Sequence, residues 1–155
     1  IRTEADEVQY NLHIMLRFDL ERALISGDLQ VRNLEAAWND RFAADFGYAV
    51  DRPSNGVLQD VHWSVGFFGY FPTYSLGNVY AGCLYQALRA DVPALDDQLA
   101  CGDLSAATAW LGQKVQQHGG LYEPRDVIAR AARQNPSEQP LLSYLEDKFS
   151  DLYEL

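Results

Sequence analysis

Apolar side chains recur every three or four residues along most of the chain, which is the spacing of one face of an α-helix. Two such stripes are Leu12, Leu16, Leu20 and Ala23 near the beginning, and Tyr80, Leu84 and Leu88 near the middle. No convincing run alternates between apolar and polar residues as a half-buried strand would, and only 29–31 and 57–59 are candidates for short extended segments. The pattern predicts an all-α fold.

Glycines, prolines and capping residues predict where the helices begin and end. Gly27 follows one helical pattern as a C-terminal cap, a second pattern ends before Gly47, and Pro124 suits the first turn of a later helix. Residues 47–61 have the turn chemistry of a long polar loop. The expected helices cover about residues 2–25, 34–46, 63–70, 74–90, 93–100, 103–118 or 105–118, and 123–134, followed by a last one that holds 141–152.

Residues 55–78 do not fit this helical pattern. Four glycines and Pro72 interrupt regular structure there, and each glycine destabilises a helix interior by roughly 1 kcal/mol relative to alanine. The polar and aromatic residues among them are Gln59, Asp60, His62, Trp63, Tyr70 and Tyr74. Ordinary helix packing does not require this mixture, so we interpret the segment as a functional site. The alternative is a buried polar corner between helices.

The first predicted helix carries a polar stripe opposite its apolar one. Its members are Arg2, Asp6, Tyr10, His13 and Arg17, each three or four residues from the next. These residue types suit fixed hydrogen-bonding geometry better than the flexible lysine and glutamate of a solvated face. A salt-bridged surface or interdomain face is the alternative. On one continuous helix Arg2 and Arg17 would stand about 22 Å apart, too far to bind the same carboxylate.

Charge and composition narrow the class of partner. The net charge is −10 and the isoelectric point is near 4.5, which argues against nucleic acid and anionic membranes because phosphate binding needs clustered lysine and arginine. No run of 18 apolar residues is present to span a bilayer, and the length suits one domain or one lobe of a larger protein.

Cys83 and Cys101 form no CxxC motif and fit a cytoplasmic, reducing compartment. Cys83, Trp38 and Trp110 are expected in the core.

The motifs of this chain resemble those of one family. They are Gly56-x-x-Gln59-Asp60-x-His62-Trp63, Phe68-Gly69-Tyr70-Phe71-Pro72-Thr73-Tyr74 and, at the beginning, Ile1-Arg2-x-x-Ala5-Asp6. They are similar to signatures of the thermostable carboxypeptidase (carboxypeptidase Taq) family, which are zinc carboxypeptidases that use an HExxH helix. This chain contains no HExxH. The resemblance therefore implies the C-terminal part of a longer enzyme, with the zinc ligands and the catalytic glutamate upstream and no metal ligand in residues 1–155.

The resemblance also implies how this chain would bind substrate. Arg2 is expected to hold the free carboxylate of a peptide through two parallel hydrogen bonds, with Asp6, one turn along, holding the guanidinium in place. Arg17 is the competing anchor. Gln59 and Asp60 are the other expected substrate-binding residues, and Asp60 is also expected to accept the spare N–H of a zinc-bound histidine.

His62, Tyr70 and Tyr74 are the expected catalytic residues. His62 would hydrogen-bond the substrate carbonyl or carboxylate, and the two phenols would donate to the tetrahedral intermediate, although each tyrosine alone is equally well explained as a core residue. His13 is expected to be a packed helix histidine, and His118 to lie at a helix C-terminus. The aromatic residues expected to pack, or to line a side-chain pocket, are Trp63, Phe67, Phe68 and Phe71.

Two other interpretations stay open. One is a non-enzymatic helical module that binds peptides or proteins through the tyrosine-rich segment. The other is a self-contained hydrolase built on Asp60 and His62, for which no serine or cysteine nucleophile motif is present. In the leading interpretation the partners are peptide C-termini, the remainder of the same polypeptide and a second copy in a homodimer. Alone, the chain is expected to be inactive and to hold no cofactor.

Overall fold

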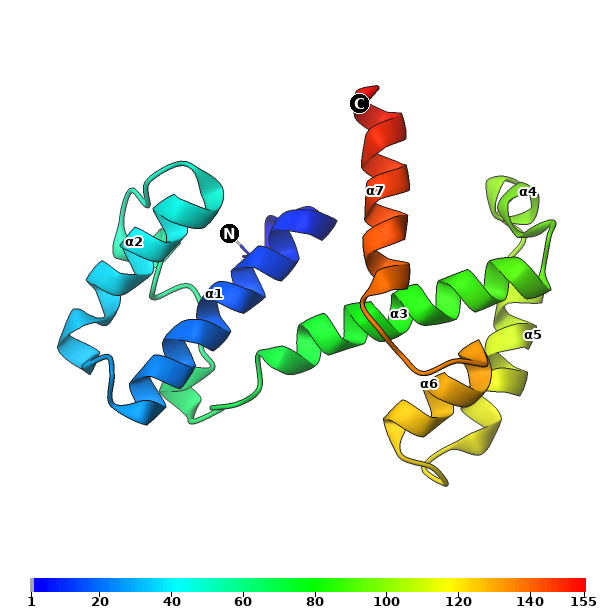
Figure 1. The fold of residues 1–155 in the computed structure, drawn as a ribbon, viewed down its shortest axis with the longest axis horizontal. Helices are drawn as coiled ribbons and strands as arrows, with labels where there is room; N and C mark the ends of the chain where they lie inside the picture. Colours follow the sequence, from blue (N-terminus) through cyan, green and yellow to red (C-terminus); the bar gives the residue numbers. More distant parts are fainter. Residues whose placement is uncertain (1) are drawn as a thin grey trace. The chain divides into compact units, whose positions relative to one another are not determined.

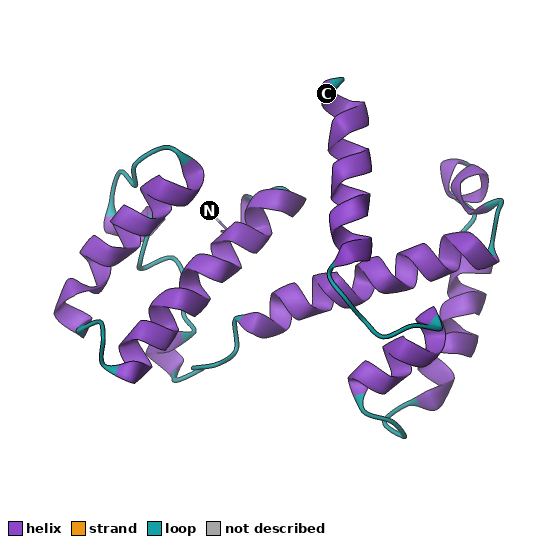
Figure 2. Ribbon diagram, viewed as in Figure 1, coloured by secondary structure: helices purple, strands orange, loops and turns teal. Residues whose placement is uncertain are grey.

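The computed structural model describes residues 2–155, and within this range the chain is helical without any strand (Figure 2). The predicted all-α fold is confirmed. The α-helices are α1 (Glu7–Ser26), α2 (Leu34–Phe46), α3 (Pro72–Asp91), α4 (Leu95–Ala100), α5 (Ser105–Lys114), α6 (Pro124–Ala132) and α7 (Gln139–Tyr153). The single-turn 3-10 helices are η1 (Arg2–Glu4), η2 (Val31–Asn33), η3 (Pro53–Asn55), η4 (Trp63–Val65) and η5 (Gln116–His118).

The chain divides into two compact units, Ile1–Leu76 and Gly77–Leu155, and α3 runs from the first into the second. In the first unit α1 and α2 lie side by side (Figure 1). Their core consists of Leu16, Leu20, Trp38 and Phe42. The second unit has its own core, made of Leu88, Leu95, Trp110 and Ala131. The core positions predicted for Trp38, Trp110 and Cys83 are confirmed.

The first helix begins later than the sequence pattern predicts. Asp6 is its N-cap, because the Asp6 carboxylate accepts hydrogen bonds from the backbone N–H groups of Val8 (3.0 Å) and Gln9 (2.8 Å). Residues before Asp6 therefore leave the α1 axis, and Arg2 belongs to the separate turn η1. At the other end Gly27 adopts φ +85°, the left-handed cap predicted from its sequence.

Other predicted boundaries need smaller corrections. The helix expected over 63–70 is only the turn η4. The helix expected to begin at Asp103 or Ser105 begins at Ser105, and its range to residue 118 is divided into α5 and η5. The candidate extended segments, 29–31 and 57–59, form turns or lead into one. Within residues 2–155, none of the helices combines the length and the apolar character that crossing a bilayer requires.

Candidate functional site

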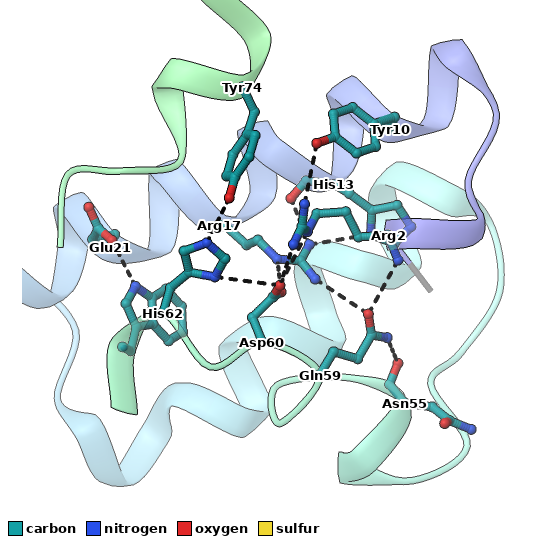
Figure 3. Close-up of polar contacts among 11 residues, drawn as sticks. Arg2, Tyr10, His13, Arg17, Glu21, Asn55, Gln59, Asp60, His62 and Tyr74 are labelled. Carbon is teal, nitrogen blue, oxygen red and sulfur yellow. Dashed lines mark hydrogen bonds and ion pairs between the residues drawn. The ribbon is translucent and has the colours of Figure 1, made fainter. Parts of the chain in front are cut away.

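The polar site of the first unit is built around the carboxylate of Asp60, which lies between two guanidinium groups (Figure 3). Arg2 donates from Nε (3.2 Å) and Nη2 (2.9 Å) to Oδ1, and Arg17 donates from Nε to Oδ2. Asp60 comes from the loop between α2 and α3, whereas Arg17 lies on α1 and Arg2 on η1. Burial alone would raise the pKa of Asp60, but the charge and hydrogen bonds of the two arginines outweigh it and lower that pKa.

This convergence overturns two predictions about Arg2. The expectation that Arg2 and Arg17 are too far apart for one carboxylate assumed a continuous helix from residue 2, and the actual helix begins at Glu7. The expectation that Asp6 holds the Arg2 guanidinium fails for the same reason. Asp6 caps α1, and Asp60 holds Arg2 instead.

Arg17 is a fully buried cation whose nitrogens all have partners. Its side chain is 0% exposed. Besides Asp60, it donates from Nη1 to the backbone oxygen of His13 (2.7 Å) and from Nη2 to Oε1 of Gln59 (3.4 Å). Its guanidinium also lies over the Trp38 ring, 4.6 Å from the centroid. Burial lowers the pKa of Arg17 despite the opposing effect of Asp60. Arg17 therefore anchors the loop to α1.

Arg2 keeps a small exposed surface, with its side chain 12% accessible. Its Nη1 donates to the hydroxyl of Tyr10 (3.3 Å), and its guanidinium carbon lies 5.1 Å from the Tyr74 ring centroid. Burial alone would lower the pKa of Arg2, but Asp60 and Tyr10 raise it. Gln59 supports the same arrangement, since its Oε1 accepts from the Arg2 backbone N–H (3.4 Å) and its Nε2 donates to the backbone oxygen of Asn55.

His62 joins this cluster to α3. It is 8% exposed, its Nε2 lies 3.0 Å from the Tyr74 hydroxyl, and its Nδ1 lies 3.7 Å from Oδ1 of Asp60 (Figure 3). The second distance is too long for a hydrogen bond. The ring packs on Phe71, with 4.6 Å between centroids, and against Tyr70 at 5.8 Å. The structure thus brings His62, Tyr70 and Tyr74 together as one aromatic group.

Glu21 is a site residue that the sequence analysis missed. It is buried on α1, accepts from the indole Nε1 of Trp63 (2.7 Å) and accepts from the backbone N–H of Gly69. It therefore fixes both ends of the loop that follows His62. A signal was available, because Glu21 continues the polar stripe of His13 and Arg17 by one more step of four residues.

Further predictions concern the packing of ring side chains and the position of His118. His13 is buried with its ring 4.5 Å from that of Phe46, so the packed-histidine prediction is confirmed. Phe71 is buried as predicted, and Trp63 packs against the core of the first unit. Phe67 and Phe68 are 56% and 49% exposed, so neither is buried in a core within the described residues, although the Phe67 ring stacks on that of Tyr70 with 5.9 Å between centroids. That these two line a side-chain pocket stays a prediction. His118 ends the turn η5 after α5, close to the predicted position.

The donor groups of this site do not suit a metal ion. In residues 2–155 no three or more histidine, cysteine, aspartate or glutamate side chains are grouped to hold one. Asp60 already faces two guanidinium groups, and His62 faces a phenol. The zinc ligands implied by the resemblance, and the contact of Asp60 with a zinc-bound histidine, stay predictions.

Comparisons with known proteins give consistent matches. The profile described as Carboxypeptidase Taq (M32) metallopeptidase matches residues 1–149. The chain is 42% identical to Thermostable carboxypeptidase 1 of Thermus thermophilus and 40% identical to Carboxypeptidase 1 of Bacillus subtilis, in each case over 99% of this chain and 30% of the relative. The crystal structure of an M32 carboxypeptidase from Deinococcus radiodurans R1 matches with a TM-score of 0.95 at 40% identity, over 100% of this chain and 31% of that one. The chain thus spans about 30% of the length of these relatives.

Proposed function

Because this chain belongs to the carboxypeptidase Taq (M32) metallopeptidase family, we propose that it is the C-terminal portion of a metallocarboxypeptidase that removes C-terminal residues from peptides. In this proposal the metal is zinc and its ligands lie upstream of residue 1. The zinc supplies the activated water, and residues 1–155 supply substrate binding and support for the transition state. The enzyme is further proposed to be a cytoplasmic homodimer.

The observation that carries the proposal is the charge balance around Asp60. Two guanidinium groups face one carboxylate, which leaves one positive charge in excess in a largely buried place. A buried charge without a counter-ion is costly, so this cluster favours an anionic ligand. A peptide C-terminus brings a carboxylate, and an exopeptidase has to recognise it.

Arg2 is the better anchor of the two. Arg17 is wholly buried and all three of its nitrogens have partners, so it has no surface for a ligand. Arg2 is partly exposed, and a guanidinium has five N–H groups. The Asp60 carboxylate accepts hydrogen bonds from one N–H on Nε and one on Nη2 of Arg2, and the Tyr10 hydroxyl accepts one from Nη1. One N–H on each terminal nitrogen is then left, as far as residues 2–155 show, and this pair matches a carboxylate.

The neighbouring residues are proposed to assist. Asp60, supported by Arg17 and Gln59, fixes the direction in which Arg2 presents its N–H groups. The group formed by His62, Tyr70 and Tyr74 adjoins Arg2 and is proposed to stabilise the tetrahedral intermediate through hydrogen bonds.

The test is made on the full-length enzyme with Arg2→Ala and Arg2→Lys. Removing a charge-assisted contact from a desolvated site is expected to destabilise the transition state by about 1.5–3 kcal/mol, which lowers kcat/KM roughly ten- to 150-fold for ordinary peptides. Zinc content should stay unchanged. A peptide amide should be a poor substrate of the wild type and lose little more with either variant, because it offers no carboxylate.

Arg52→Ala is the matched control, since Arg52 is an exposed arginine of the same unit whose ion pair is with its neighbour Asp51. Arg52→Ala should leave kcat/KM unchanged for both the free peptide and the peptide amide. Equal losses for the free and amidated peptides in Arg2→Ala would mean that Arg2 supports the fold and does not bind the carboxylate. A full-length protein that binds peptides with no turnover would favour the non-enzymatic alternative.

A further inference from the structure

The loop between His62 and Phe71 presents aromatic side chains to solvent. Phe67 is 56% exposed and Tyr70 is 46% exposed. Residues 61–71 contain no aspartate, glutamate, lysine or arginine, although the net charge of the chain is −10. Half-exposed rings on one uncharged segment are typical of a surface that contacts an apolar group. The chemistry of this loop therefore differs from that of the charged cluster around Asp60.

The backbone of this loop is fixed at several points. Glu21 accepts a hydrogen bond from the backbone N–H of Gly69, and the backbone N–H of Phe67 donates to the carbonyl oxygen of His62 (2.8 Å). Gly66 and Gly69 adopt φ of +80° and +78°, a conformation that favours glycine. A phenylalanine ring has only two rotatable bonds. Little conformational freedom is therefore lost when a ligand contacts Phe67.

A series of ring contacts leads from the Arg2 guanidinium to Phe67. The guanidinium carbon lies 5.1 Å from the centroid of the Tyr74 ring. The Tyr74 and Tyr70 centroids are 5.4 Å apart, and the Tyr70 ring stacks on that of Phe67 with 5.9 Å between centroids. The series thus begins at the proposed carboxylate anchor and ends on an exposed ring.

The length of this series limits which part of a peptide can reach Phe67. An extended peptide advances about 3.3–3.6 Å per residue, so the three steps from Arg2 to Phe67 span at most about five residues. With the terminal carboxylate on Arg2, the residue to be released occupies the beginning of the series. The exposed end of the series is then beside residues on the other side of the bond to be cleaved.

We infer that Phe67, stacked on Tyr70, is a specificity-determining residue that contacts an apolar side chain of the substrate. This side chain belongs to one of the last five residues of the peptide and lies N-terminal to the scissile bond. The inference rests on the proposed function, in which Arg2 binds the terminal carboxylate. The contact buries apolar surface of both partners, so it favours leucine or phenylalanine over glycine at that position and involves no covalent step.

A series of peptides tested on the full-length enzyme checks this. All peptides have the same C-terminal residue with a free carboxylate, and leucine or phenylalanine replaces glycine at one of the second to fifth positions from the C-terminus. The wild type should prefer the apolar residue at one of these positions by roughly three- to tenfold in kcat/KM, as one aromatic contact contributes. Phe67→Ala should remove this preference, with a larger loss on the apolar peptide than on the glycine peptide.

Two further variants serve as controls. Phe68→Ala is the matched one, because Phe68 is 49% exposed on the same loop and, among the described residues, has no ring contact of the kind that joins Phe67 to Tyr70. This variant should keep the preference. Phe67→Leu retains an apolar side chain without the ring, so it should keep much of the preference for leucine, and it keeps the test available if the alanine variant does not fold.

An apolar preference that survives Phe67→Ala would overturn the inference, and so would a wild type that has no such preference. Equal losses of the preference in Phe67→Ala and Phe68→Ala would overturn it as well, since the loop as a whole would then be responsible. The preference for a free carboxylate over an amide, measured on the same preparations, separates these results from a failure of the proposed function. If the wild type requires the carboxylate while Phe67→Ala leaves the apolar preference intact, only the role of Phe67 is wrong.

Discussion

The hydrogen-bond partners of His13 determine its protonation state. A guanidinium can only donate, so the contact between Arg17 Nη1 and His13 Nδ1 at 3.3 Å requires a lone pair on that ring nitrogen. His13 is therefore neutral, with its proton on Nε2. Burial and the charge of Arg17 lower the pKa of His13 from 6.5 to about 4, which agrees with a neutral ring. Phe42 and Phe46 pack on the ring and add no charge.

The lowered pKa of His13 predicts a loss of stability in mild acid. Between pH 6.5 and about 4 the unfolded chain binds a proton at residue 13 and the folded chain does not, so the free energy of unfolding falls as the pH falls. The loss reaches at most about 3.5 kcal/mol, since one pKa unit corresponds to about 1.4 kcal/mol. His13→Gln removes the titration and keeps an acceptor for Arg17. Denaturant unfolding at several pH values should give a flatter profile for this variant between pH 6.5 and 4.

The ionisation of Asp60 affects the free energy of unfolding at lower pH than that of His13 does. Its pKa is lowered in the folded state, so its contribution to stability is full above pH 3.8 and decreases below it. The two effects are thus separable by pH. Parallel profiles of the wild type and His13→Gln from pH 6.5 to 4 would show that His13 is protonated in the folded protein.

At the level of helices, local signals in the sequence predict most of the fold. The apolar stripe of α1 and the caps Gly27 and Gly47 lie where the pattern places them, because periodicity and turn chemistry depend on neighbouring residues. The start of α1 was also encoded locally, in Asp6 followed by Glu7, and the prediction overlooked this cap.

The site was less predictable because its contacts are not local. The sequence singled out Arg2, Arg17 and Asp60, yet 58 residues separate Arg2 from Asp60 and 43 separate Arg17 from it. Helical spacing carries no information over such separations. The place of Glu21 on the polar stripe of α1 was its signal in the sequence. Its partners, Trp63 and Gly69, lie in a loop, and helical periodicity does not predict the path of a loop.

The crossing of α3 and α7 in the second unit gives a prediction about glycine. A Cβ at Gly82 would lie 2.8 Å from the backbone nitrogen of Leu141, so Gly82→Ala should force the two helices apart and destabilise the chain by about 1–3 kcal/mol. Gly112→Ala in α5 is the matched control. A Cβ there meets nothing within 4 Å, and the replacement should stabilise the helix by roughly 0.5–1 kcal/mol.

Thermal unfolding distinguishes the two substitutions by the sign of the change in Tm. For a chain of this size 1 kcal/mol corresponds to about 2–4 °C. A rise in Tm for Gly82→Ala would show that α3 and α7 do not approach each other so closely.

At the scale of the whole molecule, several large hydrophobic side chains of the described residues are exposed to solvent. Among the large hydrophobic side chains, Met15 is 46% exposed, Leu58 70% and Leu152 63%. The only buried residue of α7 is Pro140 among those that the structure describes in that helix. The proposal that residues 1–155 work together with the remainder of a longer polypeptide predicts that some of these side chains are covered in the full-length protein.

The isolated chain should therefore bind no zinc tightly and hydrolyse no peptide. A catalytic zinc site needs about three protein ligands on one centre, and residues 2–155 hold no group of that kind. The purified chain is first shown to be helical by circular dichroism, so that a negative result does not reflect unfolding. Metal content is then measured by elemental analysis, and activity with peptides that the full-length enzyme cleaves. Stoichiometric zinc together with chelator-sensitive hydrolysis would contradict the prediction, because this chain would then contain a complete metal centre and the assignment of the ligands to upstream residues would be wrong.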